Sequence, residues 1–276
     1  VAVEAVVIAG GSVYGRAAAD GVAAWLGAAG RGYRPGGRDV PGVPPSPVIP
    51  AAILYDLGNG GDKGWGLEPP YRAMGVAAAK AAGARFTLGT AGAGCGAMAG
   101  GLKGGVGSAS VVAESGYTVG ALAAVNSVGA PIAPGSRAFW AAPFEIGDEF
   151  GGLGAAELRA APDDWGLSKV APGVGANTTP ALIATDLALT PAEARRVAMM
   201  AQDGMARALR PIHTPFDGDV VFVLSTGQRQ SAEPRPMAIA RLGALAADCL
   251  ARAIARGVYE ARPWPGTSVT CWKDLS

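Results

Sequence analysis

The stretch that decides the fold runs from residue 177 to residue 193 and reads Asn177-Thr178-Thr179-Pro180-Ala181-Leu182-Ile183-Ala184-Thr185-Asp186-Leu187-Ala188-Leu189-Thr190-Pro191-Ala192-Glu193. Its apolar residues between 178 and 189 predict a buried strand. A helix should follow directly, because a threonine hydroxyl can cap the first turn, proline fits that turn and the glutamate can reach back. A strand that leads into a helix is typical of an α/β fold.

The same alternation extends in both directions along the chain. Apolar patterning predicts further strands at residues 3–9, 49–57, 108–113, 119–125 and 219–224. It predicts helices at 16–29, 71–82, 190–209 and 235–256. The core-facing stripes of the first and last helices would be Ala18, Val22, Trp25 and Leu26, and Ile239, Leu242, Leu245, Ala246 and Leu250. We therefore expect one α/β domain over residues 1–276 with its sheet buried.

Two long segments interrupt this alternation. Residues 30–47 are rich in Gly, Pro and Arg, and residues 131–177 contain several prolines and glycines. Segments as long as residues 131–177 that lack secondary structure are uncommon inside compact domains unless they serve a function. A segment that is cut at its end would be one such case, so we expect the second loop to be accessible to proteolysis.

Composition excludes several classes of protein. The chain has 276 residues, 50% of them hydrophobic and 16% charged, with a net charge of +1. This excludes a disordered chain, and the lack of a basic run argues against nucleic-acid binding. No uncharged apolar stretch reaches about 18 residues, so no membrane span is expected. Three widely spaced cysteines and a single histidine argue against a zinc site and fit a reducing, cytoplasmic compartment.

The chain begins with Val1 rather than Met, and an apolar run follows almost at once. A natural protein rarely starts inside a core strand. We therefore expect that an N-terminal portion is missing, together with any signal peptide it carried.

Thr178 is the candidate nucleophile. A threonine hydroxyl inside a chain is a poor nucleophile, but a break in the peptide bond between Asn177 and Thr178 would free an α-amine with a pKa of roughly 8. That amine could act as the base for the hydroxyl. One cut would therefore create both reactive groups. The alternative is an ordinary threonine at the start of a strand.

A second polar motif, His213-Thr214-Pro215-Phe216-Asp217-Gly218-Asp219, follows about forty residues later. Asp217 and Asp219 lie two residues apart at the start of a strand, so their side chains can project to the same side. Two carboxylates there could hold the ammonium or hydroxyl of Thr178 and relay protons. The alternative is a plain Asp-Gly turn.

Two other interpretations of single motifs are less favoured. A catalytic triad through His213 would need a nucleophile elbow, and no Gly-x-Ser-x-Gly is present, so we expect a structural histidine. The glycines between 10 and 15 follow a strand and open a helix, as a phosphate-binding loop does. A nucleotide-binding α/β protein is therefore an alternative, although the GxGxxG spacing and a ribose-binding acid are lacking.

Five motifs taken in order carry a family resemblance over nearly the whole chain. They are Ala9-Gly10-Gly11-Ser12-Val13-Tyr14-Gly15, Gly92-Ala93-Gly94-Cys95-Gly96-Ala97, Lys103-Gly104-Gly105-Val106-Gly107-Ser108-Ala109-Ser110, Asn177-Thr178-Thr179 and the His213–Asp219 motif. Together they resemble the P1 peptidase family, peptidase family S58. This family includes D-aminopeptidase/esterases, β-peptidyl aminopeptidases and nylon-oligomer hydrolases. The threonine and the Asp-Gly-Asp turn are most similar to the nylon-oligomer hydrolase branch.

The resemblance implies an αββα sandwich like that of N-terminal-nucleophile hydrolases, cleaved autocatalytically into chains 1–177 and 178–276. It also implies roles for individual residues: Thr178 as nucleophile, Asn126 as amide donor to the oxyanion and Tyr55 near the nucleophile. The nylon-hydrolase branch has a lysine where Gly101 stands here. Lys103 is then either a catalytic residue or part of the common Lys-Gly-Gly segment.

The predicted activity is hydrolysis of amides in small peptides or ω-amino-acid oligomers, with no metal or organic cofactor. The resemblance further implies a homo-oligomer, tetrameric or larger, of cleaved chains. The nearest alternative is an acyltransferase of the ornithine-acetyltransferase type, which shares the self-cleaving threonine and a related fold. Its cleavage junction is of the Ala-Thr-Met-Leu type, whereas Ala-Asn-Thr-Thr-Pro occurs here.

Overall fold

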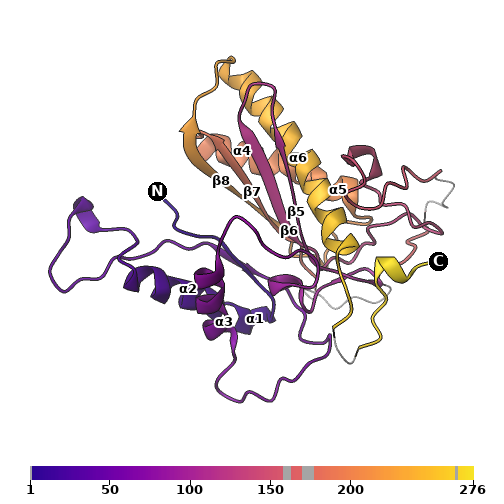
Figure 1. Ribbon diagram of the computed structural model, residues 1–276, viewed down its shortest axis with the longest axis horizontal. Coiled ribbons are helices and arrows are strands. Elements are labelled where there is room, and N and C mark those ends of the chain that lie inside the picture. Colours follow the sequence, from indigo (N-terminus) through magenta and orange to yellow (C-terminus); the bar gives the residue numbers. More distant parts are fainter. Residues whose placement is uncertain (1, 158–162, 170–176, 265–266) are drawn as a thin grey trace.

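The computed structural model describes residues 2–157, 163–169, 177–264 and 267–276. Its main sheet has four strands in the order β5 (Val106–Val112), β6 (Thr118–Ala124), β7 (Pro180–Leu187) and β8 (Val220–Arg229). Strand β6 is antiparallel to both β5 and β7, whereas β7 and β8 are parallel (Figure 1). The C-terminal end of β6 and the N-terminal ends of β7 and β8 therefore lie side by side at the same end of the sheet.

Three helices cover one face of this sheet: α4 (Pro191–Ala201), α5 (Asp203–Ala208) and α6 (Arg235–Tyr259) (Figure 1). Alternate residues of the strands point to them, because successive side chains in a strand face opposite sides. The shared core contains Ala121 and Ile183 from the sheet and Leu242 and Leu250 from α6, all fully or almost fully buried. The predicted stripe of α6 is confirmed, with Leu245 only partly buried.

The predicted start of α4 is confirmed. The Thr190 side chain accepts a hydrogen bond from the backbone N–H of Glu193, whose carboxylate accepts one from the backbone N–H of Thr190. The hydrogen bond from Arg235 lowers the pKa of Glu193 to about 2. The prediction of one helix up to 209 was wrong, because it breaks at Gln202. After the break Gly204 lies so close to α6 that a Cβ would meet the carbonyl oxygen of Ala247 at 2.2 Å.

The N-terminal part forms a smaller layer of its own. Its parallel strands are β1 (Val7–Ala9) and β2 (Ala51–Ile53), and its helices are α1 (Ser12–Gly15), α2 (Ala17–Ala28) and α3 (Tyr71–Ala81). A short hairpin joins β3 (Met98–Ala99) to β4 (Leu102–Lys103). A small core of Leu54, Ala93, Ala97 and Ala124, with Ile8 and Val106 beside it, joins this layer to the main sheet. Helices thus lie outside both sheets, as an αββα arrangement requires.

Both N-terminal strands are shorter than predicted. Gly11 has a left-handed backbone (φ 83°), which ends β1 and lets α1 begin. Helix α1 was not predicted, and α2 confirms most of the helix predicted from residue 16. Strand β2 begins after Pro50, which has no N–H to donate.

The long loop after β6 is more ordered than expected. It contains the short 3-10 helix η3 (Ala142–Phe144), and its Glu149 forms two hydrogen bonds with Arg252 of α6. Phe139 stacks on Trp272 of the C-terminal segment. The first half of this loop is therefore docked on the core. The predicted accessible segment before Asn177 lies largely outside the described residues.

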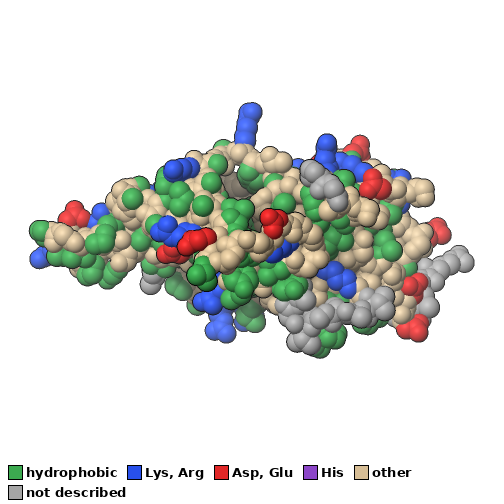
Figure 2. All heavy atoms as spheres, turned by 90° about the horizontal axis from the view of Figure 1, so that it is seen from below, with side chains coloured by type: hydrophobic (Ala, Val, Ile, Leu, Met, Phe, Trp, Pro, Cys, Tyr) green, Lys and Arg blue, Asp and Glu red, His purple; other side chains and the backbone are tan. Residues whose placement is uncertain are grey.

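The described residues include no helix long and apolar enough to cross a membrane. They also contain no group of three or more His, Cys, Asp or Glu side chains placed to hold a metal ion. Figure 2 shows positive and negative side chains interspersed on the face seen from below, with no single-sign patch there.

Candidate active site

The Asn177–Thr178 peptide bond lies where the ends of three strands meet. Thr178 forms an antiparallel bridge with Asn126, just after β6, and Asn177 forms a parallel bridge with Asp217, just before β8. The Thr178 N–H donates to the Asn126 carbonyl at 2.9 Å. Strand β7 itself begins at Pro180, so the predicted strand starts two residues later than expected. The sheet therefore fixes this peptide bond on both sides.

Two groups approach the Asn177 carbonyl. The Thr178 hydroxyl lies 2.5 Å from the carbonyl oxygen and donates a hydrogen bond to it. The Gly218 N–H donates to the same oxygen at 2.8 Å. A side chain at 218 would crowd the Thr178 hydroxyl, since a Cβ there would lie 3.0 Å from Thr178 Oγ1. A backbone N–H aimed at a carbonyl oxygen is the arrangement that stabilises an oxyanion in acyl transfer.

Asp219 contacts Thr179, the residue that follows the candidate nucleophile. Its Oδ1 accepts the N–H of Thr179 at 2.8 Å, and its Oδ2 lies 2.8 Å from His213 Nδ1. The side chain is 2% exposed, and this burial raises its pKa above the ordinary aspartate value, with the neighbouring Asp217 adding to the rise. Asp219 thus sits where it can exchange or hold a proton near Thr178.

Asp217 has a different set of partners. Its Oδ1 accepts the N–H of Val128 at 3.1 Å, and its Oδ2 accepts both the N–H and the hydroxyl of Thr214. These bonds tie the turn before β8 to the segment after β6. The two carboxylates are therefore near each other, as predicted, but Asp217 is engaged in holding the turn.

His213 lies closer to this site than the sequence suggested. Its backbone is left-handed, with φ of 54°, and its ring contacts Asp219. The expected structural role is compatible with this contact, because a histidine that pairs with Asp219 also fixes the carboxylate. The sequence does not show this contact, because it requires the five residues between His213 and Asp219 to fold back.

Asn126 and Tyr55 are brought together beside Thr178. Asn126 is fully buried; its Nδ2 donates to the Tyr55 carbonyl at 2.9 Å and its Oδ1 accepts the Met98 N–H at 2.9 Å. Its amide is thus held rigidly next to the bridge with Thr178. Tyr55 contributes its backbone here, and its side chain is 40% exposed. The oxyanion role of Asn126 stays a prediction.

Lys103 on β4 is fully buried, and its Nζ donates to the carbonyls of Gly94, Ala97 and Gly104 at 2.6–3.0 Å. Burial lowers its pKa to about 8. An ammonium has three donors, and all three are engaged in this geometry. Lys103 thus fastens the glycine-rich loop to the Lys-Gly-Gly segment, and a catalytic role for it stays a prediction.

Lys169 is the site residue that sequence analysis missed. Its Nζ donates to Asn177 Oδ1 at 2.6 Å and to the Met98 carbonyl at 3.0 Å. Burial lowers its pKa to about 8, and the nearby Asp217 carboxylate opposes that shift. The lysine stands in an irregular loop eight residues before Asn177. No motif or spacing in that loop signals its role.

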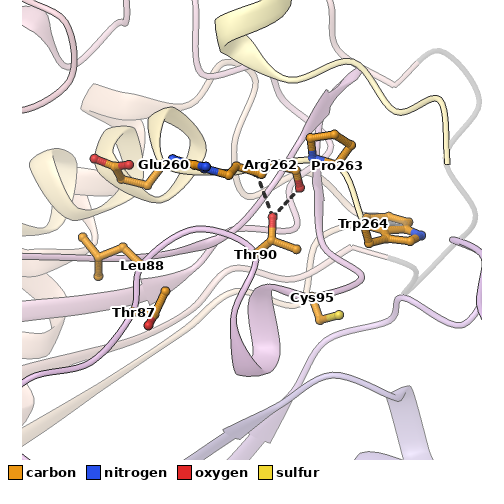
Figure 3. Close-up of a pocket in the computed structure, with 8 residues that line it drawn as sticks. All are labelled: Thr87, Leu88, Thr90, Cys95, Glu260, Arg262, Pro263 and Trp264. Carbon is orange, nitrogen blue, oxygen red and sulfur yellow. Dashed lines mark hydrogen bonds between the residues drawn. The ribbon is translucent and has the colours of Figure 1, made fainter. Parts of the chain in front are cut away.

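Two cavities are found among the described residues. One of about 670 Å³ is lined by Cys95, Thr90, Arg262 and Trp264 among others (Figure 3). Another of about 720 Å³ lies between β1, α2 and α3 and includes Asp56. Neither is lined by Thr178, Asp217 or Asp219. The atom that lies against the Thr178 hydroxyl is instead the carbonyl oxygen of Asn177.

The glycine-rich loop after β1 has an internal partner. The Gly11 N–H donates to Asp56 Oδ1 at 2.7 Å, and a Cβ at Gly10 would lie 2.4 Å from Asp56 Oδ2. A Cβ at Gly96 would meet the same oxygen at 2.4 Å. A carboxylate already occupies the place that a phosphate would take, which argues against the nucleotide-binding alternative.

Comparison with known proteins agrees with this arrangement. An uncharacterised aminopeptidase of Mycobacterium tuberculosis is 42% identical over 99% of this chain and 78% of its own length. A β-aminopeptidase of Burkholderia and the L-aminopeptidase D-Ala-esterase/amidase of Ochrobactrum anthropi have the same fold, at TM-scores of 0.59 and identities of 24% and 23%. They match 92% and 93% of this chain, which spans 66% of the length of each.

The Ochrobactrum structure is described as a variant of the N-terminal-nucleophile hydrolase fold, in agreement with the predicted fold class. The resemblance to the nylon-oligomer hydrolase branch stays a prediction. The profile of Peptidase family S58 matches residues 1–271, and the chain belongs to this family.

Proposed function

We propose that this protein is a self-processing amide hydrolase, an aminopeptidase or amidase, whose nucleophile is Thr178. Membership of a peptidase family and similarity to proteins named as aminopeptidases support amide hydrolysis. The observation that carries the finer proposal is the approach of two groups to the Asn177 carbonyl: the Thr178 hydroxyl and the Gly218 N–H.

Maturation would proceed as an N-to-O acyl shift. Thr178 Oγ1 attacks the carbonyl carbon of Asn177, and the carbonyl oxygen becomes an oxyanion that the Gly218 N–H stabilises. The bond from that carbon to the Thr178 nitrogen then breaks, and the hydroxyl proton passes to the nitrogen. Water hydrolyses the resulting ester, which leaves a carboxylate on Asn177 and a free α-amine on Thr178.

The matured enzyme would use the same atoms on its substrate. The free amine of Thr178 accepts the hydroxyl proton, and Oγ1 forms an acyl-enzyme that water resolves. Asp219 accepts a hydrogen bond from the backbone N–H of Thr179, and so keeps the nucleophile just before the start of β7. Small peptides or ω-amino-acid oligomers are the proposed substrates, and the homo-oligomeric assembly remains part of the proposal.

Substitutions at two adjacent threonines test this function. In the full-length protein, Thr178→Ala should leave one uncut chain without amidase activity, whereas Thr178→Ser should still cleave. Thr179→Val is the matched control, because the buried Thr179 hydroxyl has no partner among the described residues. It should cleave and hydrolyse like the parent. Intact mass and release of an aminoacyl anilide are the measurements, and activity retained by Thr178→Ala would refute the proposal.

A further inference from the structure

The side chain of Asn177 is held as specifically as its carbonyl. The residue is 2% exposed, and its Oδ1 accepts a hydrogen bond from Lys169 Nζ at 2.6 Å. The same ammonium donates to the Met98 carbonyl, which fixes its position from the other side. Asn177 Nδ2 has no partner among the described residues. The site therefore recognises the oxygen of this side chain.

The position of Asn177 has a consequence for the substrate. In maturation Thr178 Oγ1 attacks the Asn177 carbonyl, and in turnover the same atom attacks the substrate carbonyl. If the Gly218 N–H serves both reactions, the two carbonyls occupy the same place. The side chain on the acyl part of the substrate must then enter the space that the Asn177 side chain leaves after the cut.

We propose that Lys169 forms the acyl side-chain subsite of the mature enzyme and selects substrates whose acyl residue carries an acceptor oxygen at the position of Asn177 Oδ1. Asparaginyl and aspartyl amides have this oxygen. The inference rests on the proposed function, and it assigns the substrate class of that site.

The chemistry of the lysine supports this selection. An ammonium has three donors and no acceptor, so a carbonyl or carboxylate oxygen satisfies it and an apolar side chain does not. A leucyl residue, close in size to asparagine, would leave one N–H donor of the Lys169 ammonium without an acceptor. Asp217, the nearby carboxylate, favours the charged form of Lys169. Hydrogen bonds to a charged partner have the larger effects on binding.

The preference can be measured on the full-length, cleaved protein with anilides of asparagine, aspartate and leucine. We expect kcat/KM to be about ten- to a hundredfold higher for the first two than for the leucine anilide. Lys169→Met should remove this preference, and the exposed Lys80→Met on α3 should keep it. Equal kcat/KM for all three anilides in the parent would overturn the inference.

The self-cleavage reaction gives a second test, which does not depend on added substrate. Asn177→Leu and Lys169→Met should each slow the cut by about tenfold, and the double variant should be no slower than either single variant. Effects that multiply would contradict the inference. Failure of the parent to cleave or to hydrolyse any anilide would instead refute the proposed function, so the two failures are distinguishable. Circular dichroism checks that each variant folds.

Discussion

The backbone N–H of Gly218 lies 2.8 Å from the carbonyl oxygen of Asn177, and this hydrogen bond links the start of β8 to the candidate scissile bond. The Asp-Gly-Asp motif thus contributes a backbone N–H donor to this carbonyl oxygen, in addition to its two carboxylates. A side chain between them would come within 3.0 Å of the Thr178 hydroxyl.

Gly218→Ala tests this relationship. The added Cβ would lie 3.0 Å from Thr178 Oγ1, a distance at which the hydroxyl must move. We expect self-cleavage to slow by at least about tenfold, since crowding of this kind typically costs about 1–3 kcal/mol. Gly120→Ala on β6 is the control, because its Cβ would meet nothing nearer than 3.8 Å. Time courses of cleavage by intact mass decide; equal rates for the two variants would count against the role of Gly218.

Asp219→Asn should retain the hydrogen bond from Thr179 and lose the charge. We expect kcat/KM to fall by at least about tenfold, as is typical for loss of a group that assists proton transfer. Burial raises the pKa of Asp219, so the parent should lose activity as the pH falls through a value above the ordinary 3.8, while the carboxylate gains a proton. The variant should lack this contribution to the loss of activity at low pH, and it should keep the contribution from protonation of the Thr178 amine. An unchanged pH profile in Asp219→Asn, with the exposed Asp203→Asn as control, would contradict this.

Glu149 and Arg252 join the long loop to α6 through two hydrogen bonds of 2.5 and 3.0 Å, and their side chains are 14% and 7% exposed. Glu149→Ala should lower the free energy of unfolding by about 3 kcal/mol, because it leaves a buried guanidinium without its partner. Urea denaturation measures this change. The exposed Glu68→Ala should change the free energy by less than about 0.5 kcal/mol. A comparably small change in Glu149→Ala would show that the loop does not depend on this pair.

Lys103 gives a pH dependence of stability. Burial lowers its pKa from 10.5 to about 8 in the folded protein. Between these values the unfolded chain binds a proton that the folded chain does not, so this lysine makes the free energy of unfolding rise with pH across that window. The slope is at most about 1.4 kcal/mol per pH unit. Below pH 8 both states are protonated and the dependence vanishes.

Comparison of the parent with Lys103→Met isolates this contribution. The free energy of unfolding of the parent minus that of Lys103→Met should increase from pH 8 to pH 10.5, and it should be constant below pH 8. Lys80→Met should show no such trend relative to the parent. A constant difference across the whole range would mean that Lys103 titrates at its ordinary pKa in the folded protein.

The elements with local signals were predictable from the sequence. The capping box at Thr190 is confirmed because its two hydrogen bonds join residues three positions apart. The stripe of α6 is confirmed because helix periodicity depends on neighbours in the chain. The break at Gln202 was missed, since it depends on how closely Gly204 packs against another helix.

In the candidate site, too, the residues with a local sequence signal were predicted and the residue that depends on tertiary contacts was not. Asn177, Thr178, Asp217 and Asp219 were predicted because they form short motifs, and the structure brings them together. Lys169 was not predicted, because its contact with Asn177 depends on tertiary structure and not on a local motif. Sequence patterns carry no signal for such a contact.

The most direct test of the account is N-terminal sequencing of the purified full-length protein, combined with its intact mass. We predict two associated chains, the smaller of which begins Thr178-Thr179-Pro180. A fully active protein with the bond between Asn177 and Thr178 intact would contradict the account.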